Sequence, residues 1–214
     1  GVGDLLDRVC SEFPEDADLS EDEDEIKVAV IGRPNAGKSS LINRILGEER
    51  VIVSDVAGTT RDAIDSHFVK GGDKYLFIDT AGMRKRGKID ETVERYSVVR
   101  SLAAVDRSDV CVIMVDAGEG LTEQDTKIAG YAHEQGRACI IAVNKWDSIE
   151  KDDKTMKSFR LRVKEHFAYM SYAPILFISA KTGKRVDNLL DEIKEVNIQH
   201  KRRITTGMLN DILN

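Results

Sequence analysis

The sequence has few cysteines, no long apolar run and no excess of positive charge, and each absence excludes a class of protein. Its three cysteines, among 214 residues, lack the spacing of a metal-ligand set, so we expect core thiols in a reducing compartment, the cytoplasm. No apolar stretch approaches the length of a transmembrane helix, so we expect no membrane partner. The net charge of −6 argues against a nucleic-acid-binding surface spread over the whole chain.

A glycine-rich segment, GRPNAGKS at 32–39, has the pattern of a loop that binds phosphate groups. Gly32 and Gly37 allow the backbone to turn tightly enough for successive N–H groups to point at phosphate oxygens. Lys38 can reach the β- and γ-phosphates, and the hydroxyl of Ser39 can bind Mg²⁺. The segment therefore predicts a nucleoside triphosphate as ligand.

The flanking residues place this segment between a strand and a helix. Residues 26–31 form an apolar run typical of a buried strand, and the apolar residues of 39–47 recur at helical spacing. The positive end of the helix dipole then lies at the loop, where it favours an anion. A pattern this short also arises by chance, so the ligand has to be identified from further motifs in the sequence.

Two further segments fit the metal ion and the γ-phosphate. FIDTAG at 77–82 is an apolar strand followed by Asp79, which can bind a Mg²⁺-coordinated water, and Gly82, whose N–H can approach the γ-phosphate. In AGTTRD at 57–62, Thr60 can reach the metal with its hydroxyl and the γ-phosphate with its N–H. Mg²⁺ is therefore an expected cofactor.

Two segments nearer the C-terminus indicate which base is bound. An apolar strand leads into NKWD at 144–147, where the carboxylate of Asp147 can accept from two adjacent N–H groups of guanine. Adenine offers no matching donor pair. ILFISAK at 175–181 is another strand, after which the N–H of Ala180 can donate to guanine O6. Five motifs in this order predict GTP and GDP as ligands.

Strands and helices alternate along the chain. Residues 63–70 and the strand that follows GGDK (71–74) are expected to form an antiparallel hairpin, and further strands alternate with helices up to residue 196. This order predicts an α/β fold, in which a mostly parallel sheet is covered on both faces and the ligand loops follow the strands' carboxyl ends.

The motifs GRPNAGKSSL, GTTRD and DTAG followed by Met83 resemble the Era-like branch of the translation-associated GTPases. Within that branch, RPNAGKSSL, GTTRD, DTAGMRKRGK and VNKWD are most similar to the second G domain of the EngA (Der) family, over about 26–196. The resemblance implies a three-layer P-loop NTPase G domain with one antiparallel edge strand. It also implies a GTP-hydrolysing switch in assembly of the large (50S) ribosomal subunit.

The resemblance also implies how hydrolysis proceeds with Met83 after the DTAG motif. Ras-like GTPases have glutamine at this position, which orients the attacking water. In the Era-like family its loss is associated with a K⁺ ion near the phosphates, bound partly by the loop asparagine, here Asn35. A fixed cation can offset charge between the β- and γ-phosphates as an arginine finger does. The alternative is that Asn35 only stabilises the turn after Pro34.

The predicted site residues come from all five motifs. The nucleotide-binding set is Gly32, Asn35, Ala36, Gly37, Lys38, Ser39, Ser40, Asp79, Gly82, Asn144, Lys145, Asp147, Ser179, Ala180 and Lys181. The predicted catalytic residues are Lys38, Asn35, Thr60 and Gly82. The predicted metal ligands are Ser39, Thr60 and Asp79 for Mg²⁺ and Asn35 for K⁺.

Both ends of the chain are consistent with a tandem protein. VGDLLD at 2–7 echoes VDNLLD at 186–191, so we interpret residues 1–25 as the tail of an upstream G domain plus an acidic linker. The alternative is an N-terminal amphipathic helix of this domain alone. Residues 26–198 are predicted as the G domain and 199–214 as the start of a truncated KH-like domain. The partners implied by the resemblance are the other G domain and the KH-like domain in cis, and the large subunit with its rRNA.

Two other functions fit the sequence. A tRNA-modification GTPase of the MnmE type shares GRPNAGKSS, GTTRD and DTAG, although its G domain lies inside a helical domain. A module that senses GTP with negligible hydrolysis is also compatible with Met83. The basic segment 83–91 is either a solvated face or a contact for RNA or the other G domain when GTP orders the switch.

Overall fold

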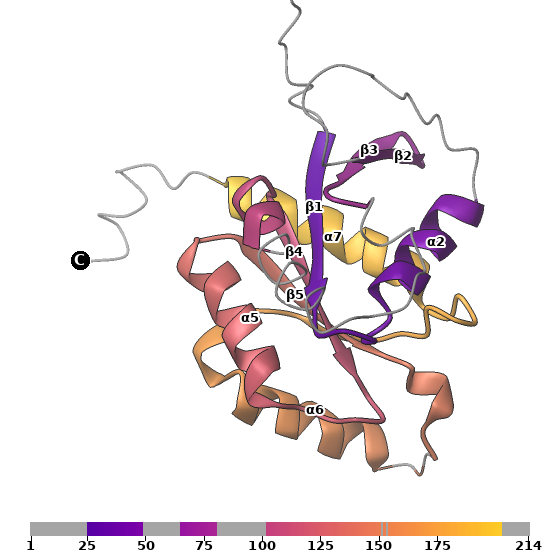
Figure 1. The fold of residues 1–214 in the computed structure, drawn as a ribbon, viewed down its shortest axis with the longest axis vertical. Coiled ribbons are helices and arrows are strands. Elements are labelled where there is room, and N and C mark those ends of the chain that lie inside the picture. The colour runs from indigo at the N-terminus through magenta and orange to yellow at the C-terminus, as the bar shows by residue number, and fades with distance from the viewer. Residues whose placement is uncertain (1–24, 49–64, 81–101, 151, 153, 203–214) are drawn as a thin grey trace, which may run out of the picture.

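The computed structural model describes residues 25–48, 65–80, 102–150, 152 and 154–202 of the chain. Within these ranges a six-stranded sheet has the order β2-β3-β1-β4-β5-β6 (Figure 1). The strands are β1 Glu25–Gly32, β2 Ser66–Lys70, β3 Asp73–Phe77, β4 Val110–Asp116, β5 Ala138–Asn144 and β6 Ile175–Phe177. The helices are α2 Lys38–Glu48, α5 Glu123–Glu134, α6 Thr155–His166 and α7 Val186–Lys201, with short 3₁₀ turns η1 Trp146–Ser148 and η2 Ala168–Met170.

One edge of the sheet is antiparallel and the rest is parallel. β2 pairs antiparallel with β3, whereas β3, β1, β4, β5 and β6 are parallel to their neighbours. The hairpin turns through Gly71 and Gly72, whose φ angles are 61° and 92°. Positive φ angles suit a two-residue hairpin loop, and most residues other than glycine adopt them only with strain. The predicted α/β class, with one antiparallel edge strand, is confirmed.

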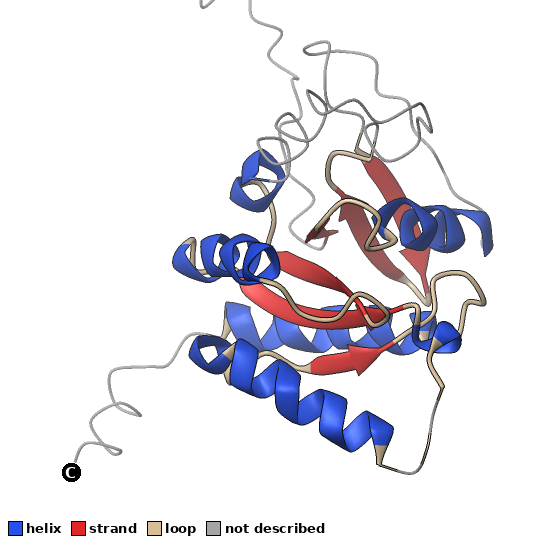
Figure 2. Cartoon of the chain, turned by 60° about the horizontal axis from the view of Figure 1, so that its bottom comes forward, coloured by secondary structure: helices blue, strands red, loops and turns tan. Residues whose placement is uncertain are grey.

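Helices cover both faces of the sheet (Figure 2). Side chains of α2 and α7 pack into one buried cluster, and side chains of α5 and α6 pack into another. Neighbouring residues of β4 divide between them, since Val112 and Met114 belong to the first and Cys111 and Ile113 to the second. Successive strand residues point to opposite faces, so a strand buried on both sides reads as a continuous apolar run.

The helix ends differ somewhat from the sequence pattern. The apolar spacing that starts at Thr155 reaches Met170, but α6 ends at His166, because Phe167 leaves helical geometry (φ −110°, ψ 43°) and its side chain is buried in the core. The final helix instead continues past Val196 to Lys201. Apolar spacing stops at Val196, but no glycine or proline interrupts the residues that follow.

The described residues add two findings about membranes and metals. Among them, no helix is both long and apolar enough to cross a bilayer. Nor do three or more histidine, cysteine or acidic side chains gather within this part of the chain as a cluster that could bind a metal ion.

Candidate nucleotide-binding site

The glycine-rich loop connects β1 to α2 at the carboxyl edge of the sheet. Three of its residues have positive φ: Gly32 (146°), Asn35 (62°) and Gly37 (99°). A Cβ on Gly32 would lie 2.5 Å from the carbonyl oxygen of Met114 on β4, so the close approach itself requires glycine. The loop therefore packs tightly on the sheet and leads into the first turn of α2, whose N–H groups have no acceptor within the helix.

Lys38 lies at the start of α2 and bonds back to the loop. Its Nζ donates to the carbonyl oxygens of Gly32 and Arg33, each at 2.7 Å. Burial lowers the pKa of Lys38 from the ordinary 10.5 to about 8, because a desolvated ammonium is costly. A phosphate group beside Nζ would supply the missing counter-charge.

This pKa predicts proton uptake on nucleotide binding. With a pKa of about 8, about half of the Lys38 amines are neutral at pH 8, and bound phosphates would raise that pKa. Binding should therefore take up about half a proton at pH 8, and affinity should fall as pH rises from 8 toward the pKa of the complex. Calorimetric titration with GDP in two buffers of different ionisation enthalpy measures the uptake. The Lys38→Met variant should show none, and equal uptake in that variant would assign the proton to another group.

Asn144, at the end of β5, connects three motifs. Its Nδ2 donates to the carbonyl oxygen of Ala36 at 2.8 Å, and its Oδ1 accepts the N–H of Ala180 at 2.9 Å. The side chain is buried, and a Cβ on Gly37 would lie 2.1 Å from Nδ2. Asn144 and Ala180, both predicted as nucleotide-binding residues, bond each other here and so connect the phosphate loop with the segment after β6.

Lys145 forms an ion pair that the sequence did not predict. Its backbone is left-handed (φ 59°), and its Nζ lies 2.5 Å from Oδ2 of Asp116. Asp116 ends β4 and pairs in register with Asn144, which explains their proximity. Burial alone raises the pKa of Asp116, but the bonds from Lys145 and from the N–H groups of Gly118 and Glu119 outweigh burial and lower it. The carboxylate therefore stays ionised and fixes the position of Lys145.

Asp147 is exposed at the rim of the same loop. A hydrogen bond from the hydroxyl of Ser179 lowers the pKa of Asp147 below its ordinary value. An ionised carboxylate is an acceptor only, as recognition of two guanine N–H donors requires. Behind it, the ring of Trp146 packs on Phe177 with centroids 4.5 Å apart, and the backbone N–H of Trp146 donates to the carbonyl oxygen of Ile178 at 3.1 Å.

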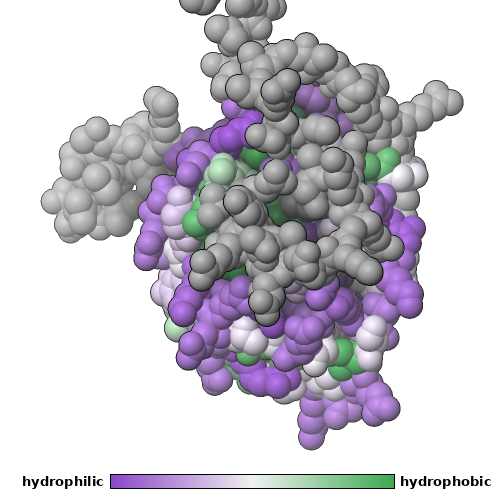
Figure 3. All heavy atoms as spheres, viewed as in Figure 1, coloured by the Kyte–Doolittle hydropathy of each residue, from purple (hydrophilic) through white to green (hydrophobic). Residues whose placement is uncertain are grey.

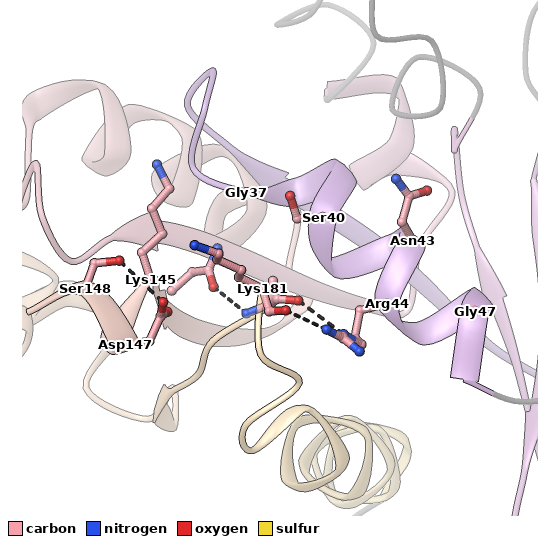
Figure 4. Close-up of a pocket in the computed structure, with 11 residues that line it drawn as sticks. Gly37, Ser40, Asn43, Arg44, Gly47, Lys145, Asp147, Ser148 and Lys181 are labelled. Atoms are coloured by element: carbon pink, nitrogen blue, oxygen red, sulfur yellow. Dashed lines mark hydrogen bonds between the residues drawn. The ribbon is translucent and has the colours of Figure 1, made fainter.

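These motifs enclose one pocket of about 620 Å³ (Figure 4). Asp147 and Lys145 lie on one side of it, and Ser40, Asn43 and Arg44 from α2 lie on the other. The full lining is Gly37, Ser40, Asn43, Arg44, Gly47, Asn144, Lys145, Asp147, Ser148, Ala180 and Lys181. This volume lies within the range of small-ligand sites, so the fold brings the phosphate loop and both guanine motifs to one cavity.

Two arginines that position these loops were missed by sequence reasoning. From α2, Arg44 donates to the carbonyl oxygens of Ala180 (3.4 Å) and Lys181 (2.5 Å). Arg33 of the glycine-rich loop donates to Asp125 (2.8 Å), and also to Glu119 and to the carbonyl oxygen of Gly120. These partners are 86 to 137 residues away in the chain, so no local sequence signal identifies them.

The expected metal ligands are divided between described and undescribed residues. Ser39 begins α2, and Asp79 follows β3 with a left-handed backbone (φ 54°), its N–H donated to Asp65 at 2.9 Å. Because β1 and β3 are adjacent and parallel, both residues lie beyond the same edge of the sheet. A hydroxyl and a carboxylate are oxygen donors that suit Mg²⁺. Asn35, the expected K⁺ ligand, is exposed.

Several predicted residues fall outside the part of the chain that the structure describes. They are Thr60, Gly82 and Met83, together with the segments 1–24 and 203–214 on which the tandem interpretation depends.

Two predicted serines lie within the described chain. Ser40 lies in the first turn of α2. Ser179 lies after β6, where its side-chain oxygen also accepts the N–H of Thr182 at 3.1 Å.

The family model described as a 50S ribosome-binding GTPase matches residues 27–145. The chain belongs to this family. It is 62% identical to the GTPase Der of Ruminiclostridium cellulolyticum and 58% identical to that of Geobacillus thermodenitrificans, over its whole length in both cases. It covers 48% and 49% of these two proteins, so it spans about half the length of the curated relatives it matches. The resemblance to EngA (Der) is thereby confirmed, and the MnmE-type alternative is not favoured.

Solved structures agree with this GTPase assignment. An Era variant from Aquifex aeolicus bound to GDP·AlF₄⁻ has a TM-score of 0.62 and 26% identity, covering 81% of this chain and 57% of that chain. Era in complex with MgGDPNP and a segment of 16S ribosomal RNA gives the same TM-score and identity, with the same coverage of both chains. The Era-like fold expected from the sequence is therefore shown, and use of Mg²⁺ follows from the GTPase family.

Proposed function

We propose that this chain is the second G domain of a Der-like protein, which binds and hydrolyses GTP as a switch in large-subunit assembly. One observation supports this most strongly: the phosphate loop and both guanine motifs line one pocket of about 620 Å³. In this proposal Asp147 accepts from the guanine N–H groups, and Lys38 exchanges its bonds to Gly32 and Arg33 for phosphate oxygens. Asn144 and Arg44 maintain the shape of the pocket rather than reading the base.

Hydrolysis would proceed by in-line attack of water on the γ-phosphorus. Lys38 and the N–H groups of the loop would offset the charge that develops on the phosphate oxygens. Met83 cannot orient water, so Thr59, Thr60 or backbone groups would do so. Thr60 and Gly82 would sense the γ-phosphate and release their segments when it leaves.

The donor chemistry of the site fits two cations. Ser39, Asp79 and Thr60 would bind Mg²⁺, and Asn35 would bind K⁺ through its amide oxygen. Both ions, when bound, would neutralise charge on the β- and γ-phosphates. Asn35 has a left-handed backbone, a conformation that asparagine tolerates, and it lies at an exposed position of the loop.

The proposal includes a domain arrangement and the partners that go with it. We interpret residues 1–25 as the end of an upstream G domain plus a linker, 26–198 as the G domain, and 199–214 as the start of a KH-like domain. These neighbours would be partners in cis, and the large subunit with its rRNA would be the partner in trans. The ribosomal partner and the free thiols of Cys111 and Cys139 support a cytoplasmic location.

Single-turnover GTP hydrolysis in matched KCl and NaCl buffers tests the proposal. We expect faster hydrolysis in KCl, and we expect the Asn35→Ala variant to lose that difference while it still binds GDP. Potassium stimulation that persists in the variant would remove Asn35 from the cation site. GTP binding with negligible hydrolysis in both salts would instead support a nucleotide-sensing module.

A further inference from the structure

α6 and the residue before it form a basic segment of the described surface. Between Lys154 and His166 the sequence has five lysines and arginines and a single acid, Glu165, in a chain of net charge −6. Lys154, Lys157, Arg162 and Lys164 are exposed. Figure 3 shows hydrophilic side chains over the lower edge of the molecule, where Figure 1 places α6.

Two of these cations lie at the end of α6 that disfavours positive charge, although Lys164 lies in the last turn, where the dipole favours it. Lys154 and Lys157 lie at its N-terminal end, where the helix dipole favours negative charge. Arg160 follows Lys157 by three residues and precedes Lys164 by four, so like charges occupy neighbouring positions on one side of the helix. Such pairs of like charge destabilise an isolated helix. α7, by contrast, places the base Lys194 among the acids Asp191, Glu192 and Glu195.

The cations of α6 also have no acidic partners in the described part of the chain. None of the ion pairs formed there includes Lys154, Lys157, Arg160, Arg162 or Lys164, whereas lysines on β2 and α7 pair with Asp187, Asp73 and Asp109. Arg160 and Arg162 instead lie over the rings of Phe177 and Phe159, with guanidinium carbons 5.3 and 4.8 Å from the ring centroids. Their positive charge is thus available to an external anion.

A groove of about 460 Å³ runs beside the helix. It is lined by Gly120, Leu121, Phe159, Arg162, Glu165 and His166. The carbonyl oxygen of Gly120 accepts a hydrogen bond from Arg33 of the phosphate loop, and His166 Nε2 contacts the carbonyl oxygen of Thr122 at 3.0 Å. The groove therefore adjoins the same segment that fixes the phosphate loop.

From these observations we infer that α6 and its groove form an RNA-binding surface that contacts the phosphate backbone. Regularly repeated phosphates complement a row of unpaired cations along a helix, and the contact needs no base readout. The inference rests on the proposed ribosomal function and names the surface through which this domain would contact rRNA.

Two triple variants of the 214-residue chain test this surface. The first, Lys154→Gln, Lys157→Gln and Lys164→Gln, removes three exposed charges from α6. The matched control, Lys127→Gln, Lys194→Gln and Lys201→Gln, removes the same charge from α5 and α7. Affinity for protein-free 23S rRNA and for purified 50S subunits is measured against KCl concentration, with GDP affinity as the check on folding.

We expect the α6 variant to bind RNA at least about tenfold more weakly at 0.15 M KCl, and the salt slope to fall by about two to three, since each phosphate contact contributes about 0.9. The control should keep the wild-type slope. Equal losses of RNA affinity in both variants, or no loss in the α6 variant, would overturn the proposed RNA-binding surface. The cations of α6 would then face solvent or bind an acidic protein. If the unsubstituted chain binds neither RNA nor 50S subunits in any nucleotide state, the proposed ribosomal partner fails as well.

Discussion

Replacing Gly37 with alanine is expected to lower the affinity for GDP and GTP by at least about 100-fold. The new Cβ would lie 2.1 Å from Nδ2 of Asn144, and the backbone there has a φ of +99°. Asn144 would have to move, which breaks its buried bonds to Ala36 and Ala180. Each such loss costs about 1–3 kcal/mol, and both lie between the phosphate loop and the guanine motif.

The hairpin offers a matched control for the backbone strain. Gly72 has a similar φ of +92°, but a Cβ there would meet no atom within 4 Å. Gly72→Ala should lower the thermal stability while nucleotide affinity stays near that of the parent chain. Titration with a fluorescent GDP analogue, alongside thermal unfolding of each variant, separates the two effects. A folded Gly37→Ala chain with unchanged affinity would show that Asn144 does not need its present position.

Much of the fold was predictable because its physical causes are local. β4 and β5 are buried on both faces, so Val110–Asp116 and Ala138–Asn144 read as apolar runs, and their order with the helices fixes a parallel sheet. Gly71 and Gly72 mark the hairpin in the same local way. The motif residues follow these strands, which places them at one edge of the sheet.

The contacts that position the site were not predictable, because they join single polar residues far apart in the chain. Asp116 pairs with Lys145, and Arg33 with Asp125, which lies 92 residues away. A lone acid after a strand or at the start of a helix has ordinary explanations, such as the bonds from Gly118 N–H to Asp116 and from Thr122 to Asp125. Only the tertiary arrangement shows that these acids also fix the phosphate loop and the guanine motif.

Replacing Asp147 with asparagine is expected to change which base the pocket accepts. The exposed carboxylate can accept from N1–H and the exocyclic amine of guanine, whereas a carboxamide presents one acceptor and one donor group. Xanthine has a carbonyl in place of that amine and suits the donor. Because a site built for hydrogen bonds rejects a mismatched ligand by up to about 10⁴-fold, GDP affinity should fall at least about 100-fold and the preference should move to XDP. Asparagine can still accept from Ser179, so the loop should keep its shape.

Competition between GDP and XDP for a fluorescent guanine nucleotide measures this change. Asp152→Asn is the matched control, because Asp152 is also exposed and bonds only the start of α6, through Lys154 and Thr155, in the described chain. It removes the same charge outside the pocket and should leave the preference for GDP intact. If the Asp147 variant kept that preference, the base would be read by other groups, and the backbone N–H of Ala180 together with Lys145 would become the next candidates. A reversed preference would instead show that one exposed carboxylate, which accepts a hydrogen bond from Ser179, decides which nucleotide binds.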